Sequence, residues 1–128
     1  MSPRLHPDEG EMMANPVIHF EVAGKDGPAL QEFYRSVFDW TIDADNPMNY
    51  GVIASSGEGG IGGGVTASQD GSSMVTFYVQ VDDLQAALDK AETAGGRTVM
   101  PPMDVPGGPK IAQFTDPEGN CIGLTSGM

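Results

Sequence analysis

The chain has 128 residues, 39% of them hydrophobic, with six basic and eighteen acidic residues and a formal net charge of −12. This length suits a single globular domain, and the lack of any Lys/Arg cluster argues against nucleic acid or an anionic membrane as a partner. The single cysteine, Cys121, excludes an intrachain disulfide and is typical of a reducing compartment. No apolar run approaches the roughly 20 residues of a membrane-spanning helix, so we expect a cytoplasmic protein.

The N-terminal residues differ in character from the rest of the chain. Residues 1–15 mix Pro, Asp, Glu and His without periodicity, which predicts a flexible tail. Residues 16–126 instead alternate periodic segments with turns rich in Gly and Pro, and we expect them to form the single domain.

The first half of this domain predicts a strand, a helix and three short strands. Alternating apolar residues over Val17–Val22 indicate a strand in which His19 and Glu21 share one face. Apolar residues at helical spacing predict a helix near residues 28–38, with Phe33 and Phe38 in the core. Short strands are predicted for residues 40–43, 50–55 and 59–65.

The second half repeats this order. Met74–Val81 is the clearest strand in the chain, with Thr76 and Tyr78 on the same face. Asp83 is a favourable N-cap residue for a helix over residues 83–94, which buries Leu88. Further strands are predicted for residues 98–100, 111–115 and 121–125, with a Pro- and Gly-rich loop over residues 101–109.

The two halves superpose by a simple numerical shift. Adding 57 takes His19 to Thr76 in the first strands, and adding 61 takes Gly62 to Gly123 in the later ones. A repeat of this kind predicts two similar modules, each too small to bury its own apolar face alone. We place them at about residues 17–65 and 75–125.

Several motifs, combined with this order, resemble one known superfamily. They are Phe33-Tyr34, Phe38-Asp39-Trp40, Val81–Leu84, Ala94–Gly96 and the turn Asp116–Asn120. The chain resembles the vicinal oxygen chelate superfamily, which includes glyoxalase I, bleomycin-resistance proteins and extradiol dioxygenases, and within it the single-domain subgroup related to lactoylglutathione lyase. The resemblance implies an α+β fold in which two βαβββ modules form an open eight-stranded cup, the glyoxalase/bleomycin-resistance-like fold.

The resemblance also implies where a metal would lie. Metal-dependent members place four ligands inside the cup, at positions that correspond here to His19, Gly62, Thr76 and Gly123. Only His19 among these can coordinate a metal, whereas zinc, iron or nickel sites in enzymes generally need three or more N, O or S ligands. We therefore expect no bound metal, no other cofactor and no glyoxalase I activity.

The polar residues of the predicted cup carry the functional predictions. If His19 faces inward, Glu21 and Tyr78 do so too, and the glycines at 62 and 123 leave room for a ligand. An acidic chain favours a cationic small molecule over an anionic one. The predicted ligand-binding residues are His19, Glu21, Tyr50, Gly62, Thr76, Tyr78 and Gly123.

Two classes of function remain open at this point. One is a protein of the bleomycin-resistance type, which binds and sequesters its ligand unchanged. The other is a metal-independent isomerase or lyase in which His19 is the general base, assisted by Glu21 or Tyr78, because imidazole titrates near neutral pH. In both cases the open strand edges and an apolar rim favour a homodimer.

Overall fold

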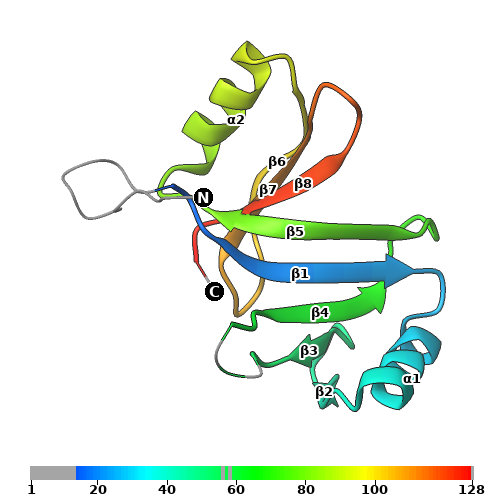
Figure 1. Cartoon of the computed structure of the whole chain (residues 1–128). Coiled ribbons are helices and arrows are strands. Elements are labelled where there is room, and N and C mark those ends of the chain that lie inside the picture. Colours follow the sequence, from blue (N-terminus) through cyan, green and yellow to red (C-terminus); the bar gives the residue numbers. More distant parts are fainter. Residues whose placement is uncertain (1–13, 56, 58, 128) are drawn as a thin grey trace, which may run out of the picture.

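A computed structural model of the protein describes residues 14–55, 57 and 59–127. These residues form one mixed sheet of eight strands with two helices (Figure 1). The predicted α+β class and the open eight-stranded sheet are therefore confirmed. Apart from residues 14 and 15, the predicted tail lies outside the described residues. Within the described ranges, neither helix is long and apolar enough to cross a membrane.

The elements follow the predicted order in both halves. Module 1 consists of β1 (Val17–Gly24), α1 (Gly27–Phe38), β2 (Ile42–Asp43), β3 (Gly51–Ile53) and β4 (Gly62–Ala67). Module 2 consists of β5 (Met74–Gln80), α2 (Leu84–Thr93), β6 (Arg97–Asp104), β7 (Lys110–Thr115) and β8 (Cys121–Thr125). The main departure is β6, which continues to Asp104 through residues that were predicted to form a loop.

Side-chain caps determine where both helices begin. The Asp26 carboxylate accepts a hydrogen bond from the Ala29 backbone N–H at 3.0 Å, and Asp83 accepts one from Ala86 at 3.0 Å. Each cap satisfies a backbone donor that has no partner within its own helix. The predicted N-cap at Asp83 is thus confirmed.

The two modules join through their first strands. The order across the sheet is β2-β3-β4-β1-β5-β8-β7-β6, with β1 antiparallel to β5, and Phe20 opposite Phe77 at this junction. Within the modules, β1 runs parallel to β4 and β5 runs parallel to β8. Figure 1 shows β6, β7 and β8 crossing the direction of β1 and β5, so the sheet bends between β5 and β8, within module 2.

The strand register corrects the numerical shift between the halves. In module 1, His19 lies beside Gly62, but in module 2 it is Tyr78, and not Thr76, that lies beside Gly123. The numerical shift had instead matched Thr76 to His19, which would place Thr76 beside Gly123. An offset of two residues keeps every side chain on its own face of the sheet, because strand side chains alternate with a period of two.

Each helix covers its own cluster of buried side chains. In module 1 the buried members of the cluster are Ile42, Ile53 and Val65, packed against Phe20, Val22, Leu30, Tyr34 and Trp40. In module 2 they are Leu84, Leu88, Ala112 and Leu124. The core prediction is confirmed for Leu88, which is 1% exposed, but is wrong for Phe33 and Phe38, which are 55% and 53% exposed. Both lie on the outer side of α1, where their rings contact Tyr34.

The two ends of the sheet are short or interrupted. At one end β2 has only two residues. At the other, β6 contains Pro101 and Pro102, and its pairing with β7 shifts register between Thr98 and Met103. Proline has no backbone N–H to donate, so β6 offers an incomplete row of hydrogen-bonding groups.

Candidate functional site

One face of the sheet carries polar side chains at the junction of the two modules. We call it the cup face, and the opposite face, which α1 and α2 cover, the helix face. His19 and Glu21 reach the cup face from β1, and Tyr78 reaches it from β5. The polar side chains that contact one another here also include Tyr50, Thr76, Gln113 and Cys121.

Glu21 is the centre of a hydrogen-bond network on this face. From module 1, the Tyr50 hydroxyl donates to Glu21 Oε2 over 2.9 Å. The same hydroxyl lies 2.8 Å from His19 Nε2, and the His19 and Tyr50 rings are stacked with centroids 6.2 Å apart. These contacts join three side chains that are up to 31 residues apart in the sequence.

Module 2 reaches the same carboxylate from the other side. The Tyr78 hydroxyl donates to Glu21 Oε1 over 3.4 Å and accepts a hydrogen bond from Gln113 Nε2 over 3.2 Å. The Cys121 thiol in turn donates to Gln113 Oε1 over 3.7 Å. Both carboxylate oxygens of Glu21 therefore accept a tyrosine hydroxyl, one from each module.

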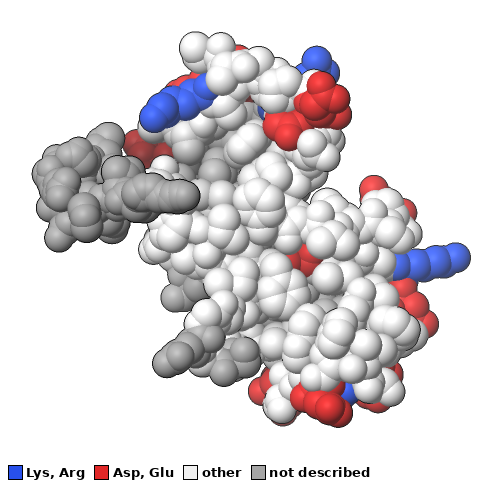
Figure 2. All heavy atoms as spheres, viewed as in Figure 1, with Lys and Arg blue, Asp and Glu red and all other residues white. Residues whose placement is uncertain are grey.

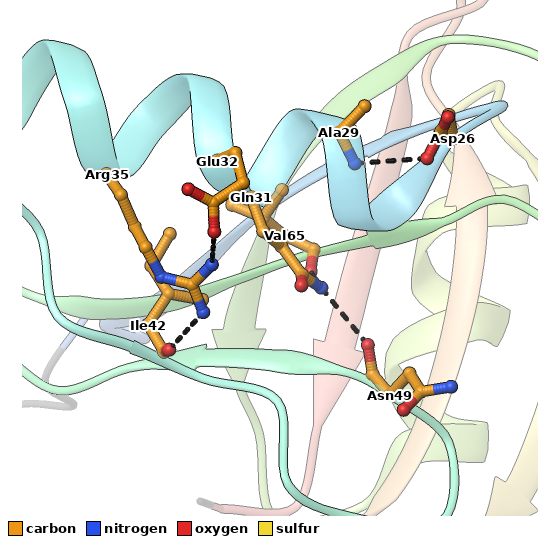
Figure 3. A network of polar contacts seen from close by, with 8 residues as sticks. All are labelled: Asp26, Ala29, Gln31, Glu32, Arg35, Ile42, Asn49 and Val65. Carbon is orange, nitrogen blue, oxygen red and sulfur yellow. Dashed lines mark hydrogen bonds and ion pairs between the residues drawn. The ribbon is translucent and has the colours of Figure 1, made fainter.

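Tyr50 is held in place by the segment that leads into β3. The Asn46 side chain accepts from the Tyr50 backbone N–H and donates to the Tyr50 carbonyl, both at 2.9 Å. Gln31 of α1, which is buried, donates to the Asn49 carbonyl at 3.1 Å and to the Val65 carbonyl at 2.9 Å (Figure 3). The helix is thus tied to the residue that precedes Tyr50 and to β4.

Glycines beneath the tyrosine rings allow this arrangement. A Cβ atom at Gly64 would lie 2.0 Å from the Tyr50 hydroxyl oxygen, and one at Gly123 would lie 2.4 Å from the Tyr78 ring. At Gly62 a Cβ would lie 2.9 Å from the Ile53 carbonyl oxygen. The prediction that Gly62 and Gly123 leave room for a ligand is therefore wrong, because the protein's own atoms already occupy both spaces.

Burial sets the protonation of the network. It raises the pKa of Glu21, although the hydrogen bonds from Tyr50 and Tyr78 oppose this shift. Burial and the nearby carboxylate raise the pKa of Tyr78 to about 12 and that of Tyr50 further still. Burial also lowers the pKa of His19. Near neutral pH, both hydroxyls are therefore protonated and His19 is uncharged.

No positive side chain balances Glu21 among the residues that the structure describes. Among these residues the ion pair between side chains joins Arg35 to Glu32, on the surface of α1 and away from Glu21. In Figure 2 the Lys and Arg side chains lie at the periphery of the molecule, and the middle of the view is largely uncharged. The carboxylate is therefore held by neutral hydroxyl groups alone.

Comparison with known proteins places this chain in a family. Residues 17–124 match the family model described as Glyoxalase/Bleomycin resistance protein/Dioxygenase superfamily. The chain belongs to this superfamily. The resemblance inferred from the sequence motifs is thus confirmed at the level of the family.

Two curated relatives of this superfamily member are much longer than the chain. "Putative glyoxylase CFP32" of Mycobacterium tuberculosis is 32% identical over 107 residues, which cover 77% of this chain and 41% of the relative. The "Anthracycline biosynthesis protein DnrV" of Streptomyces peucetius is 30% identical over 122 residues, which cover 82% of this chain and 44% of the relative. The chain thus spans only about two fifths of the length of these relatives.

Solved structures of other proteins share the fold. Methylmalonyl-CoA epimerase from Mycobacterium tuberculosis superposes with a TM-score of 0.62 at 16% identity, covering 88% of this chain and 87% of the epimerase. A superfamily member from Vibrio splendidus gives a TM-score of 0.58 at 13% identity, covering 88% and 98%. At these identities the similarity establishes the architecture and leaves the chemistry to the residues of the site.

The residues of this superfamily member do not fit the four-ligand metal site that the resemblance implied. Across residues 14–55, 57 and 59–127, no group of three or more His, Cys, Asp or Glu side chains is placed to hold a metal. His19 and Glu21 are two possible ligands, but both oxygens of Glu21 already accept hydrogen bonds. Enzymatic zinc or iron sites need a larger donor set than this.

The structure brings together some of the predicted site residues and adds one. Thr76 is buried but stays outside the network, since its hydroxyl donates to the Cys121 carbonyl at 2.6 Å. Gln113 was missed, although strand alternation places it on the cup face and in register with Gly123. The predicted residues that do form the network are His19, Glu21, Tyr50 and Tyr78.

Proposed function

We propose that this superfamily member binds a small molecule on its cup face and lacks glyoxalase I activity. The observation that carries the proposal is the network centred on Glu21, where a carboxylate without a cationic partner lies at the junction of both modules. A polar network of this kind costs stability relative to an apolar core unless every member is satisfied. Perturbed titratable groups that converge on one face are also typical of functional sites.

A thermal-shift screen of metabolites tests the binding function. A ligand that binds only the folded state adds about 2.7 kcal/mol of stability at a concentration of 100 times its dissociation constant. In a domain of this size, that stabilisation raises the melting temperature by several degrees. We expect at least one compound to do so in the wild type and to lose most of its effect in Glu21→Gln.

A charge-matched control separates the site from the surface. Glu118→Gln removes the same charge from an exposed turn that does not touch the network. This variant should keep the thermal shift of the wild type. A shift lost equally in both variants would point to general electrostatics, and a screen without any Glu21-dependent compound would refute the binding function.

The lack of glyoxalase I activity rests on the donor set at the four mapped positions, which after the correction of the register offers His19 and the protonated hydroxyl of Tyr78, fewer than the three ligands that such a site needs. We expect purified protein to hold no stoichiometric zinc, nickel or iron, and added metal to leave its melting temperature nearly unchanged. Elemental analysis measures the first and calorimetry the second. About one metal ion per chain, lost in His19→Ala, would contradict this part of the proposal.

A second candidate function is a metal-independent isomerase or lyase with His19 as general base. The His19–Tyr50–Glu21 contacts favour it, because a neutral imidazole held through one nitrogen can take up a proton on the other. Recovery of a bound ligand unchanged after incubation supports sequestration. Turnover that disappears in His19→Ala supports catalysis.

We also propose a cytoplasmic homodimer, as expected from the sequence. Its support is an apolar surface on α1, where Phe33, Val37 and Phe38 are 55%, 51% and 53% exposed. Light scattering at tens of micromolar should give a dimer for the wild type and a monomer for Phe33→Glu. The proposed cytoplasmic location is tested separately, by cell fractionation.

A further inference from the structure

We call the contacts from His19 through Tyr50 to Glu21 the module 1 arm of the network, and those from Gln113 through Tyr78 to Glu21 the module 2 arm. In the module 1 arm, each hydrogen bond is donated in the direction of Glu21. A tyrosine hydroxyl has one hydrogen, and an ionised carboxylate can only accept. Because Tyr50 uses its hydrogen on Glu21 Oε2, the contact with His19 at 2.8 Å requires a hydrogen on His19 Nε2. A neutral imidazole carries only one such hydrogen, so His19 Nδ1 is an acceptor.

The module 2 arm points in the same direction. Tyr78 uses its hydroxyl hydrogen on Glu21 Oε1, and Gln113 uses one amide hydrogen on the Tyr78 oxygen. The hydrogens of Cys121 and Thr76 are directed to Gln113 and to a backbone carbonyl. One amide hydrogen of Gln113 is the side-chain donor that these bonds leave over.

The cup face therefore presents mostly acceptors to a ligand. They are the remaining lone pairs of Glu21, the oxygens of both tyrosines and His19 Nδ1. Two aromatic rings also stand beside the imidazole of His19, with Tyr50 stacked on it and Tyr78 edge-on at a centroid distance of 5.8 Å. Aromatic faces attract cations as well, and hydrogen bonds between ionised partners are about twice as strong as neutral ones.

We infer that the cup face selects a protonated organic amine, whose ammonium group donates to Glu21 and to His19 Nδ1. This inference rests on the proposed ligand-binding function and narrows its ligand to one chemical class. A carboxylate, a phosphate or a carbonyl oxygen would set acceptor against acceptor on this face. The selectivity is thus opposite to that of a metal-centred cup, which binds oxygen atoms of its ligand.

Acid should reverse the polarity of this face. A proton added to Glu21 is donated to the Tyr50 oxygen, so that the Tyr50 hydroxyl turns to His19 Nε2 and the imidazole hydrogen moves to Nδ1. The ionisable groups that face Glu21 are His19 on β1, Tyr50 before β3, Tyr78 on β5 and Cys121 on β8. The residue of β4 beside Glu21 is a glycine. Of all these groups, only Glu21 and His19 titrate at acid or neutral pH, and protonation of either one weakens amine binding.

Three probes of matched shape test the inference, namely benzylammonium, benzyl alcohol and benzoate. Each is titrated into the protein at pH 7.5 while the ring signals of His19 and Tyr50 are followed by NMR. We expect benzylammonium to bind at least roughly tenfold more tightly than benzyl alcohol, as a hydrogen bond to a charged group allows, and benzoate to leave both rings unperturbed. Glu21→Gln should abolish the preference for the amine, and Glu118→Gln should retain it.

Several results would overturn this ligand class. Benzoate binding as tightly as benzylammonium would do so, as would no binding of the amine at concentrations up to tens of millimolar. Because Glu21→Gln could fail to fold, a second measurement uses the wild type alone, where amine affinity must fall as the pH is lowered from 7.5 to 5. An affinity that is constant or rises would reject the inference. None of these results decides the broader binding function, which depends on the thermal-shift screen.

Discussion

The two modules share one order of elements but differ in how closely side chains pack between the helix and the sheet. In module 1, the side chain of Tyr34 on α1 stacks with Trp40 and Phe38 over the helix face. In module 2, the residue that the sequence repeat equates with Tyr34 is Ala91, and a cavity of about 440 Å³ lies between α2 and the sheet. The repeat therefore preserves the backbone plan without preserving the packing density.

The modules differ in chemistry as well as in packing. Module 1 supplies the imidazole of His19 and the carboxylate of Glu21, whereas module 2 supplies the neutral donors Tyr78 and Gln113. Neither half alone satisfies both oxygens of the central carboxylate. The site thus depends on the β1–β5 junction. Matched substitutions in the two modules should therefore change stability by different amounts.

The largest effect on stability should come from changing the side chain that packs between each helix and the sheet. We expect Tyr34→Ala to lower the free energy of unfolding by about 3 kcal/mol, because it leaves a void among packed aromatic rings. Ala91→Leu extends into an existing cavity, so its effect should stay within about 1 kcal/mol in either direction. Urea denaturation measures both values. Equal losses would show that the modules are packed alike.

The next effect concerns the glycines beneath the tyrosine rings. Gly123→Ala should cost about 2 kcal/mol, because the new methyl group meets the ring of the buried Tyr78. Gly64→Ala should cost about 1 kcal/mol, since it meets the hydroxyl end of Tyr50, which can move more easily. Thermal unfolding ranks the two variants. The reverse order would mean that Tyr50 is the more rigid of the two tyrosines.

Removing each hydroxyl compares the two arms of the network directly. Tyr50→Phe should cost about 1.5 kcal/mol, and Tyr78→Phe less than about 1 kcal/mol, because the bond from Tyr50 to Glu21 measures 2.9 Å and that from Tyr78 measures 3.4 Å. Only Tyr50→Phe should also change the titration midpoint of His19 followed by NMR. A midpoint that moves equally in both variants would contradict the separate arms.

The smallest effect is a dependence of stability on pH. Burial raises the folded-state pKa of Glu21 above its ordinary value of 4.5, so the folded protein holds this proton more tightly than the unfolded chain. The resulting stabilisation is complete below pH 4.5 and is lost as the pH rises through the folded-state pKa. Glu21→Gln should therefore gain stability relative to the wild type as the pH is raised, whereas Glu118→Gln should show no such trend. Denaturation at a series of pH values provides the test.

The sequence predicted the elements well, because hydrophobic periodicity is local. The alternation around His19 and Phe20 and the cap at Asp83 each depend on residues a few positions apart, and the structure bears these out. The same local signal failed at Phe33 and Phe38, since apolar residues cover more of the circumference of α1 than the sheet can bury.

The site was only partly predictable, because its contacts span long distances in the chain. Alternation placed His19 and Glu21 on one face, but the angle at which Tyr50 approaches them depends on Asn46 and on β3. The space above Gly123 was assigned to a ligand because the repeat offset hid the fact that Tyr78 is its neighbour. Register between strands far apart in sequence is set by packing and turn geometry, which one sequence does not reveal.

The two ends of the sheet limit how copies of this protein can assemble. An open sheet can in principle grow by adding strands from another molecule, as fibres do. Here β2 offers two residues at one end, and the prolines and shifted register of β6 interrupt the other. Growth along the strand ladder is therefore blocked in both directions. Self-association is left to side-chain surfaces such as that of α1, where contact between two copies can close on itself without forming a filament.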